Sequence, residues 1–144
     1  MSAATGARRH AREVAFRVAY QADLAGDAYP LAWSLRREHE PKLTPDQVEL
    51  IEEIVAALGA RAAEIDGELQ AAMDGRWSMA RLAATDRAVL RVGVAELLAR
   101  AGSPARVVLD EAIDIARTYG SEESGRFVNG VLDRAARRLR PAEF

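Results

Sequence analysis

The chain has 144 residues, of which 49% are hydrophobic and 29% are charged, and its formal net charge is −2. This length fits one domain, which at this size buries roughly 68–70% of the surface of its unfolded chain, and the composition argues against disorder. The absence of cysteine excludes a disulfide framework, a thiolate zinc site, an iron–sulfur centre and a cysteine nucleophile.

The first half of the chain carries the apolar periodicity of helices. A first helix is predicted over about residues 8–24, and Gly26 ends it. A short second helix is expected from about residue 30 until just before residue 41. The tetrapeptide "TPDQ" then supplies Thr44 as N-cap of a capping box, and predicts a third helix over about residues 45–72.

The second half begins with a short turn predicted at residues 78–82, and three helices follow. They cover residues 85–101, 103–119 and 121–140, and their expected N-caps are Thr85, Ser103 and Ser121, respectively. The dipeptide "NG" at 129–130 is a hairpin signal, but its helical and charged flanks favour a helix with Gly130 at a close helix contact.

No stretch shows the alternation of a strand, so the sequence predicts an all-α fold. We expect about seven helices in two small antiparallel bundles that meet near "MDGRW". The N-terminal bundle would cover about residues 8–74 and the C-terminal bundle about residues 75–140, in one domain spanning 1–144.

Membrane association and catalysis both lack a recognisable signal. The basic N-terminus has no following apolar h-region, and no segment approaches 18 uninterrupted apolar residues, so we expect a soluble, cytoplasmic protein. His10 and His39 are the only histidines, and neither lies in a nucleophile or metal signature. We therefore expect neither an enzyme nor a metal or cofactor site.

Nucleic-acid binding has better support, because both ends of the chain are basic. Residues 8–17 contain four arginines against one carboxylate, and residues 126–140 contain five against one. Positions four apart on the first helix are Arg8, Arg12, Phe16 and Tyr20, and Arg9 widens this patch. Cations can hold phosphates, and an exposed ring can stack on an unpaired base for roughly 1–3 kcal/mol.

The last helix repeats the combination, with Arg126 beside Phe127. The nearby carboxylate of Glu123 could accept a hydrogen bond from a base amino group. The same residues also allow structural interpretations. Terminal arginines usually form a solvated face, and Tyr20 and Phe127 are equally compatible with the core.

Four other residues favour structural roles. Phe16 is expected in the core, and Trp33 is expected to anchor the short second helix. Trp77 is expected to plug the junction of the two bundles. Asp86 follows Thr85 at the start of a predicted helix, where a carboxylate more often interacts with the helix dipole than with a ligand.

Three segments resemble, in order and spacing, the signature regions of the NusB family of bacterial transcription antitermination factors. They are "ARRHAREVAFRVAYQADL", "RWSMARLAATDRAVLRVGVAELL" and "SPARVVLDEAIDIARTYGSEESGRFVNGVLDRAA". The segment "EESGRFVNGVLD" is the most specific. The chain departs from the family at Ala95, where many relatives have an aromatic residue, and at His10, which interrupts a run that is often fully cationic.

The resemblance implies a two-bundle all-α fold and a non-catalytic role. That role is binding the single-stranded boxA element of ribosomal RNA transcripts together with NusE, a small-subunit ribosomal protein. The complex would join other Nus factors on RNA polymerase and help transcription pass terminators. The family's RNA-binding positions fall on Arg8, Arg9, Arg12, Tyr20, Asp86, Glu123 and Phe127.

Alternatives remain open at this point. A NusB-like domain also precedes the catalytic part of a family of ribosomal RNA cytosine methyltransferases, although a chain that ends at Phe144 and lacks cysteine favours the free-standing factor. A purely protein-binding helical module, with its RNA contact supplied by a partner, is the third class. A homodimer that covers the arginine surface is a further hypothesis.

Overall fold

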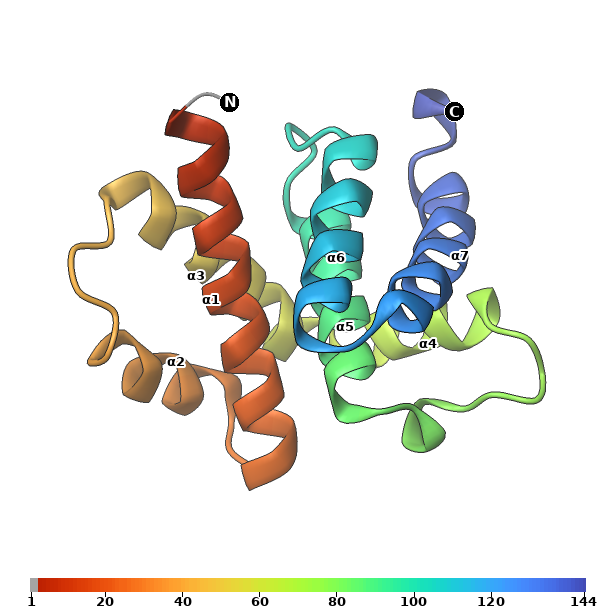
Figure 1. The fold of residues 1–144 in the computed structure, drawn as a ribbon, viewed down its shortest axis with the longest axis horizontal. Coiled ribbons are helices and arrows are strands. Elements are labelled where there is room, and N and C mark those ends of the chain that lie inside the picture. Colours follow the sequence, from red (N-terminus) through yellow and green to blue (C-terminus); the bar gives the residue numbers. More distant parts are fainter. Residues whose placement is uncertain (1–2) are drawn as a thin grey trace.

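The computed structural model describes residues 3–144, and the regular secondary structure of this part of the chain is all helical, with no strand (Figure 1). The predicted all-α fold class is therefore confirmed. The α-helices are α1 (Ala3–Ala25), α2 (Tyr29–Arg37), α3 (Pro45–Ala60), α4 (Ala62–Ala72), α5 (Ala84–Ala99), α6 (Ala105–Tyr119) and α7 (Glu122–Leu139). Two short 3-10 helices are η1 (Met79–Arg81) and η2 (Pro141–Glu143). Residues 1 and 2 of the predicted domain lie outside the described residues.

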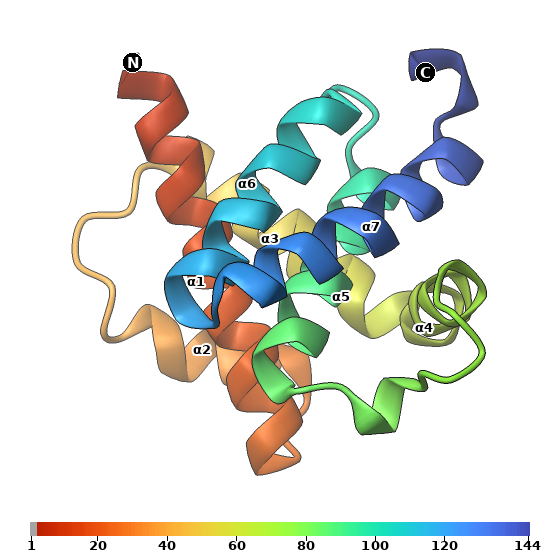
Figure 2. The same cartoon turned by 45° about the vertical axis from the view of Figure 1, so that its right-hand side comes forward.

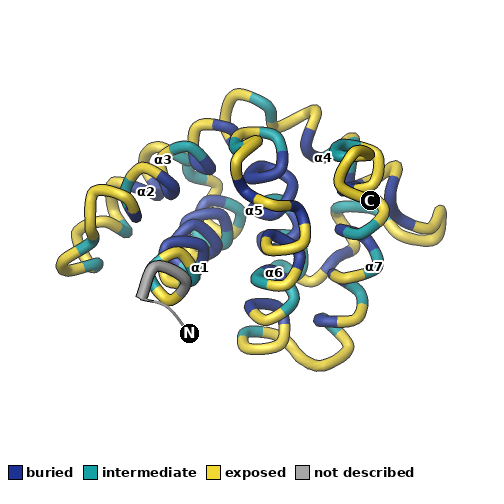
Figure 3. The backbone as a smooth tube through the Cα atoms, turned by 90° about the horizontal axis from the view of Figure 1, so that it is seen from above, coloured by how far each residue is buried: buried dark blue, intermediate teal, exposed yellow. Residues whose placement is uncertain are grey.

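The centre of the molecule is α5, which packs on α1 and α3 along one side and on α4, α6 and α7 along the other. Between Ala88 and Leu97 every α5 residue except Arg91 is buried, as the dark blue of this helix in Figure 3 shows. The short helix α2 lies outside, against α1 and α3. Trp33 anchors it there as predicted, since its indole is buried and its N–H donates to Glu52 at 3.2 Å.

Local capping chemistry sets several helix boundaries. The predicted capping box is confirmed, because the Gln47 amide donates to the Thr44 hydroxyl at 3.2 Å and the Thr44 amide donates to the Gln47 side chain at 2.9 Å. Ser121 also caps its helix, accepting from the Ser124 amide at 3.1 Å.

Two predicted N-caps are wrong. The helix α5 starts at Ala84, before Thr85, and α6 starts at Ala105, after Pro104. Ser103 forms a different bond, because its hydroxyl donates to Glu96 at 2.7 Å. That buried carboxylate is the stronger acceptor, and the sequence gives no sign that it lies within reach.

The predicted third helix is two helices, which separate at Arg61, where φ is −119°. The reason is that the two halves bury their apolar stripes against different neighbours. The helix α3 packs on α1 and α5, whereas α4 packs on α5 and α7. One straight helix cannot face both sets. We therefore propose that the two bundles divide at Arg61 rather than near residue 74.

The "NG" dipeptide lies inside α7, which confirms the helix over the hairpin. The close helix contact predicted at Gly130 is wrong, however. A Cβ there would meet only the Arg134 side chain, at 3.6 Å, whereas a Cβ on Gly93 would come within 3.0 Å of Leu132. The glycine that lets α5 and α7 approach each other is therefore Gly93.

Candidate nucleic-acid interface

The side chain of Arg12 points inward from α1, and only 4% of the residue is exposed. Its Nε and Nη2 donate to the two carboxylate oxygens of Glu96 on α5, at 2.8 and 2.7 Å. Burial by itself would lower the pKa of Arg12, but the hydrogen bonds and charge of Glu96 outweigh it and raise the pKa. The prediction that Arg12 stands on the surface with Arg8 is therefore wrong, and we leave Arg12 out of the interface.

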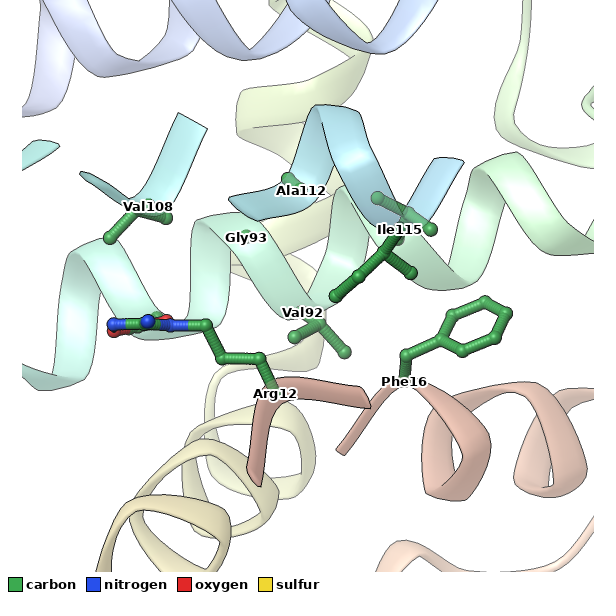
Figure 4. Close-up of a pocket in the computed structure, with 9 residues that line it drawn as sticks. Arg12, Phe16, Val92, Gly93, Val108, Ala112 and Ile115 are labelled. Atoms are coloured by element: carbon green, nitrogen blue, oxygen red, sulfur yellow. The ribbon is translucent and has the colours of Figure 1, made fainter. Parts of the chain in front are cut away.

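Figure 4 shows why position 12 is interior: Arg12 and Phe16 both project from α1 toward α5 and α6. Phe16 is 4% exposed, which confirms its predicted place in the core. The two side chains border a cavity of about 10 Å³ that Val92 and Ile115 also line. Such a volume holds roughly one water at most, so it is not a ligand site.

The remaining N-terminal arginines differ in whether carboxylates neutralise their charge. Arg8 is exposed and pairs with no carboxylate between Gly6 and Phe144. Arg9 is half-buried and lies 3.0 Å from Glu13, 3.3 Å from Glu111 and 3.4 Å from Asp114. Three carboxylates largely neutralise Arg9. Arg8 is therefore the better of the two for binding an RNA phosphate.

Tyr20 lies at the other end of α1, in an aromatic cluster. Its half-buried ring is 6.0 Å from Phe16, which in turn is 4.9 Å from Tyr119 at the end of α6. A hollow at this point is lined by Tyr20, Tyr119, Arg17 and Thr85, among others. The guanidinium of Arg17 donates to the Tyr119 hydroxyl at 2.7 Å and lies 5.1 Å from its ring centre.

Asp86 follows Thr85 in the first turn of α5 and is half-buried. Burial raises its pKa, and a hydrogen bond with the Ser124 side chain of α7 opposes part of the rise. Its Oδ1 is buried without a hydrogen-bond partner among the described residues. Asp86 thus joins the hollow beside Tyr20 to the first turns of α7.

The first turns of α7 carry the other predicted residues. Phe127 is half-buried and its ring lies 5.6 Å from that of Trp77, at an angle of 54°. Glu123 and Arg126 are exposed, and Arg126 forms no ion pair within the part of the chain that the structure describes. The prediction that Trp77 plugs the bundle junction is wrong, because 42% of this residue is exposed.

Contacts link these residues stepwise: Tyr20 and Tyr119 line the hollow with Thr85, which precedes Asp86, and Asp86 contacts Ser124 on α7. We call this set the aromatic edge. It consists of Tyr20, Tyr119, Asp86, Ser124 and Phe127. The elements that carry it, which are the second half of α1, the start of α5 and the connection from α6 to α7, lie toward the lower side in Figures 1 and 2. Arg8 lies twelve positions before Tyr20, which at a rise of 1.5 Å per residue is about 18 Å away along α1. Tyr20, Asp86 and Phe127 thus lie on α1, α5 and α7, of which α5 packs on both of the others, whereas Arg8 and Arg9 lie at the far end of α1.

Tyr119 and Ser124 of this surface, and Arg17 beside it, were missed from the sequence. Arg17 pairs with no carboxylate among residues 6–144, and it directly follows Phe16. Because Arg17 and Tyr119 are more than 100 positions apart, no local spacing connects them. The dipeptide "TY" at the end of a strongly predicted helix, close to Gly120, was the sequence feature that pointed to Tyr119.

Other kinds of site find no support in the described residues. None of the helices between residues 3 and 144 is both long and apolar enough to cross a bilayer. Nor do three or more potential metal-ligating side chains gather at one place in that part of the molecule.

Comparisons with known proteins agree on one family. The family model of NusB matches residues 9–137. The transcription antitermination protein NusB of Desulfitobacterium hafniense is 38% identical over 128 residues, covering 88% of this chain and 86% of the relative. The corresponding protein of Sorangium cellulosum is 38% identical over 134 residues, covering 93% and 94% of the two chains.

Solved structures give the same result. NusB of T. maritima has a TM-score of 0.85 at 31% identity, covering 94% of each chain. A NusB chain from the crystal structure of the antitermination factors NusB and NusE in complex with double-stranded RNA has a TM-score of 0.84 at 30% identity. That match covers 92% of this chain and 97% of the other.

Proposed function

Because this chain belongs to the NusB family of transcription antitermination proteins, we propose that it binds the boxA RNA of ribosomal RNA transcripts together with NusE. The resulting complex joins other Nus factors on RNA polymerase, in the cytoplasm, and keeps transcription of ribosomal RNA operons processive. The role is binding, without a catalytic step.

The observation that carries the RNA-binding part is the pairing pattern of the arginines. Most arginines in the described chain pair with a carboxylate within 4 Å. Arg17 and Arg126 are among those that do not, and they flank the aromatic edge at Tyr119 and Phe127. An uncompensated guanidinium beside a partly exposed ring suits a single strand, whose phosphates and unstacked bases are both accessible.

Residues of the aromatic edge and the charged residues beside it have different parts in the proposed contact. Tyr20 and Phe127 stack on bases, and Arg17 and Arg126 hold phosphates. Glu123 and Asp86 are acceptors for base amino groups. Arg8, about 18 Å from Tyr20 along α1, contacts the backbone of nucleotides beyond those that stack.

The affinity for boxA RNA, measured across salt with and without NusE, tests this function. With about three phosphates engaged at a slope near 0.7 per contact, a fourfold rise in salt should weaken single-strand binding about 20-fold. A boxA duplex and a shuffled single strand of equal length are the controls, and both should bind more weakly. No binding of single-stranded boxA by the protein with or without NusE would contradict the proposal, and binding only with NusE at a flat salt profile would favour the protein-binding module.

A further inference from the structure

Trp77 is the feature that the proposed contacts leave unexplained. It lies in the loop between α4 and η1, and 42% of it is exposed, whereas the only other tryptophan, Trp33, is 7% exposed. The indole N–H of Trp33 donates to Glu52, but the corresponding N–H of Trp77 has no partner among residues 6–144. A large apolar ring at the surface is available for contact with a ligand.

The loop that carries Trp77 is held in place by side chains from two helices. The Gln70 side chain on α4 donates to the Trp77 carbonyl at 2.8 Å and accepts from the Met79 amide at 3.3 Å. From α5, Arg87 donates to the carbonyls of Met79 and Leu82, each at 3.0 Å. Since the backbone on both sides of Trp77 is held by these bonds, little backbone ordering remains to oppose binding.

The neighbours of Trp77 match the chemistry of the aromatic edge. Its ring lies 5.6 Å from Phe127, so it continues that edge onto the loop. Arg81 is exposed, pairs with no carboxylate among the described residues, and donates to the Arg76 carbonyl at 3.1 Å, next to Trp77 in the chain. The loop thus repeats the combination of an accessible ring with an uncompensated guanidinium.

We propose that Trp77 is a further base-stacking residue, which together with Phe127 receives consecutive bases of the RNA, while Arg81 holds a phosphate between them. This inference rests on the proposed function, because the strand that reaches Phe127 is the one that continues to Trp77. The ligand is an unpaired stretch of RNA, since a base inside a duplex presents no free face to an indole.

The two tryptophans allow a direct test. In W33F, Trp77 is the only tryptophan, and its fluorescence should be quenched as single-stranded boxA is added, with the midpoint at the dissociation constant that labelled RNA gives independently. In W77F, the buried Trp33 remains and should report no quenching. W77A should bind boxA on the order of tenfold more weakly at an unchanged salt slope, and W77F should restore most of the affinity.

The failures of the two proposals are distinguishable. If the wild-type protein binds boxA but Trp77 fluorescence in W33F does not respond, the inference is overturned while the proposed function stands. The same holds if NusE alone, and not RNA, alters that fluorescence, because Trp77 then faces a protein. If the wild-type protein does not bind boxA at low salt, the proposed function fails together with the inference. Should W77A fail to fold by circular dichroism, the fluorescence of W33F decides alone.

Discussion

Arg12 of α1 and Glu96 of α5 form a buried ion pair with two parallel hydrogen bonds of 2.8 and 2.7 Å. This pair fixes the helix that carries Tyr20 against the helix that carries Asp86. Removing one partner leaves a buried charge uncompensated, so Arg12→Ala should lower the free energy of unfolding by about 3–5 kcal/mol. Urea denaturation measures this loss of stability.

The double variant R12M/E96M separates a structural role of this pair from RNA contact. Because both charges are removed together, it should lose less stability than the sum of its single variants. Its salt slope for boxA binding should equal that of the wild-type protein. A slope reduced by about 0.7 would instead mean that Arg12 engages a phosphate.

Phe127→Ala and Tyr20→Ala should each weaken boxA binding by about 1–3 kcal/mol, which is roughly 5- to 150-fold, since each removes a stacking platform. The salt slope should not change. Tyr20→Phe keeps the ring and should bind nearly as well as the wild type. Tyr29→Ala, on a half-buried tyrosine outside the aromatic edge, is the matched control for lost aromatic packing. If Phe127→Ala is destabilised and its folded fraction binds RNA normally, Phe127 belongs only to the core.

Two arginines on α7 provide a matched test of the electrostatic contribution to RNA binding. Arg126 has no carboxylate partner in the described chain, whereas Arg138, at the other end of the same helix, lies 3.5 Å from Glu68. Arg126→Ala should reduce the salt slope by about 0.7, and Arg138→Ala should leave it unchanged. Fluorescence anisotropy with labelled RNA at several salt concentrations gives both slopes. Equal effects of the two substitutions would indicate a diffuse field rather than a contact.

Asp86 makes stability depend on pH in a defined direction. Burial raises its pKa, so the folded protein holds this proton to a higher pH than the unfolded chain does. The contribution of Asp86 to folding is fully favourable below its ordinary pKa and is lost as the pH rises through the raised value. The stability of Asp86→Asn relative to the wild type should therefore be higher at about pH 7 than at about pH 3. Urea denaturation of both proteins at the two pH values checks this, and a constant difference would contradict it.

Much of the fold follows from local signals in the sequence. The capping box at Thr44 and Gln47 and the cap at Ser121 are decided by residues three positions apart, and both were predictable. The division of α3 from α4 at Arg61 was not, because it depends on which neighbours each apolar stripe meets. The same limit applies to Gly93, whose importance comes from Leu132 on another helix.

The interface shows the same division between local and distant causes. Tyr20, Asp86 and Phe127 were assigned from their segments, and their sharing of one RNA-binding surface stays a proposal. Its support is that Thr85, next to Asp86, lines a hollow with Tyr20, and that Asp86 contacts Ser124, three positions before Phe127. Arg12 looked equivalent to Arg8 because both lie on one helical line. Its burial depends on Glu96, which is 84 positions away, and no spacing rule connects the two. Trp77 was predicted at the bundle junction but is exposed. Its exposure depends on the loop that Gln70 and Arg87 hold in place.

Mapping amide chemical shifts in isotopically labelled protein during a titration with single-stranded boxA RNA tests most directly whether the aromatic edge is the RNA-binding surface. We predict saturating shifts at residues 17–21, 85–86 and 119–127, with smaller ones near Arg8 and little change in α2 and α3. Shifts concentrated in α2 and α3, with the aromatic edge unaffected at saturation, would contradict this prediction.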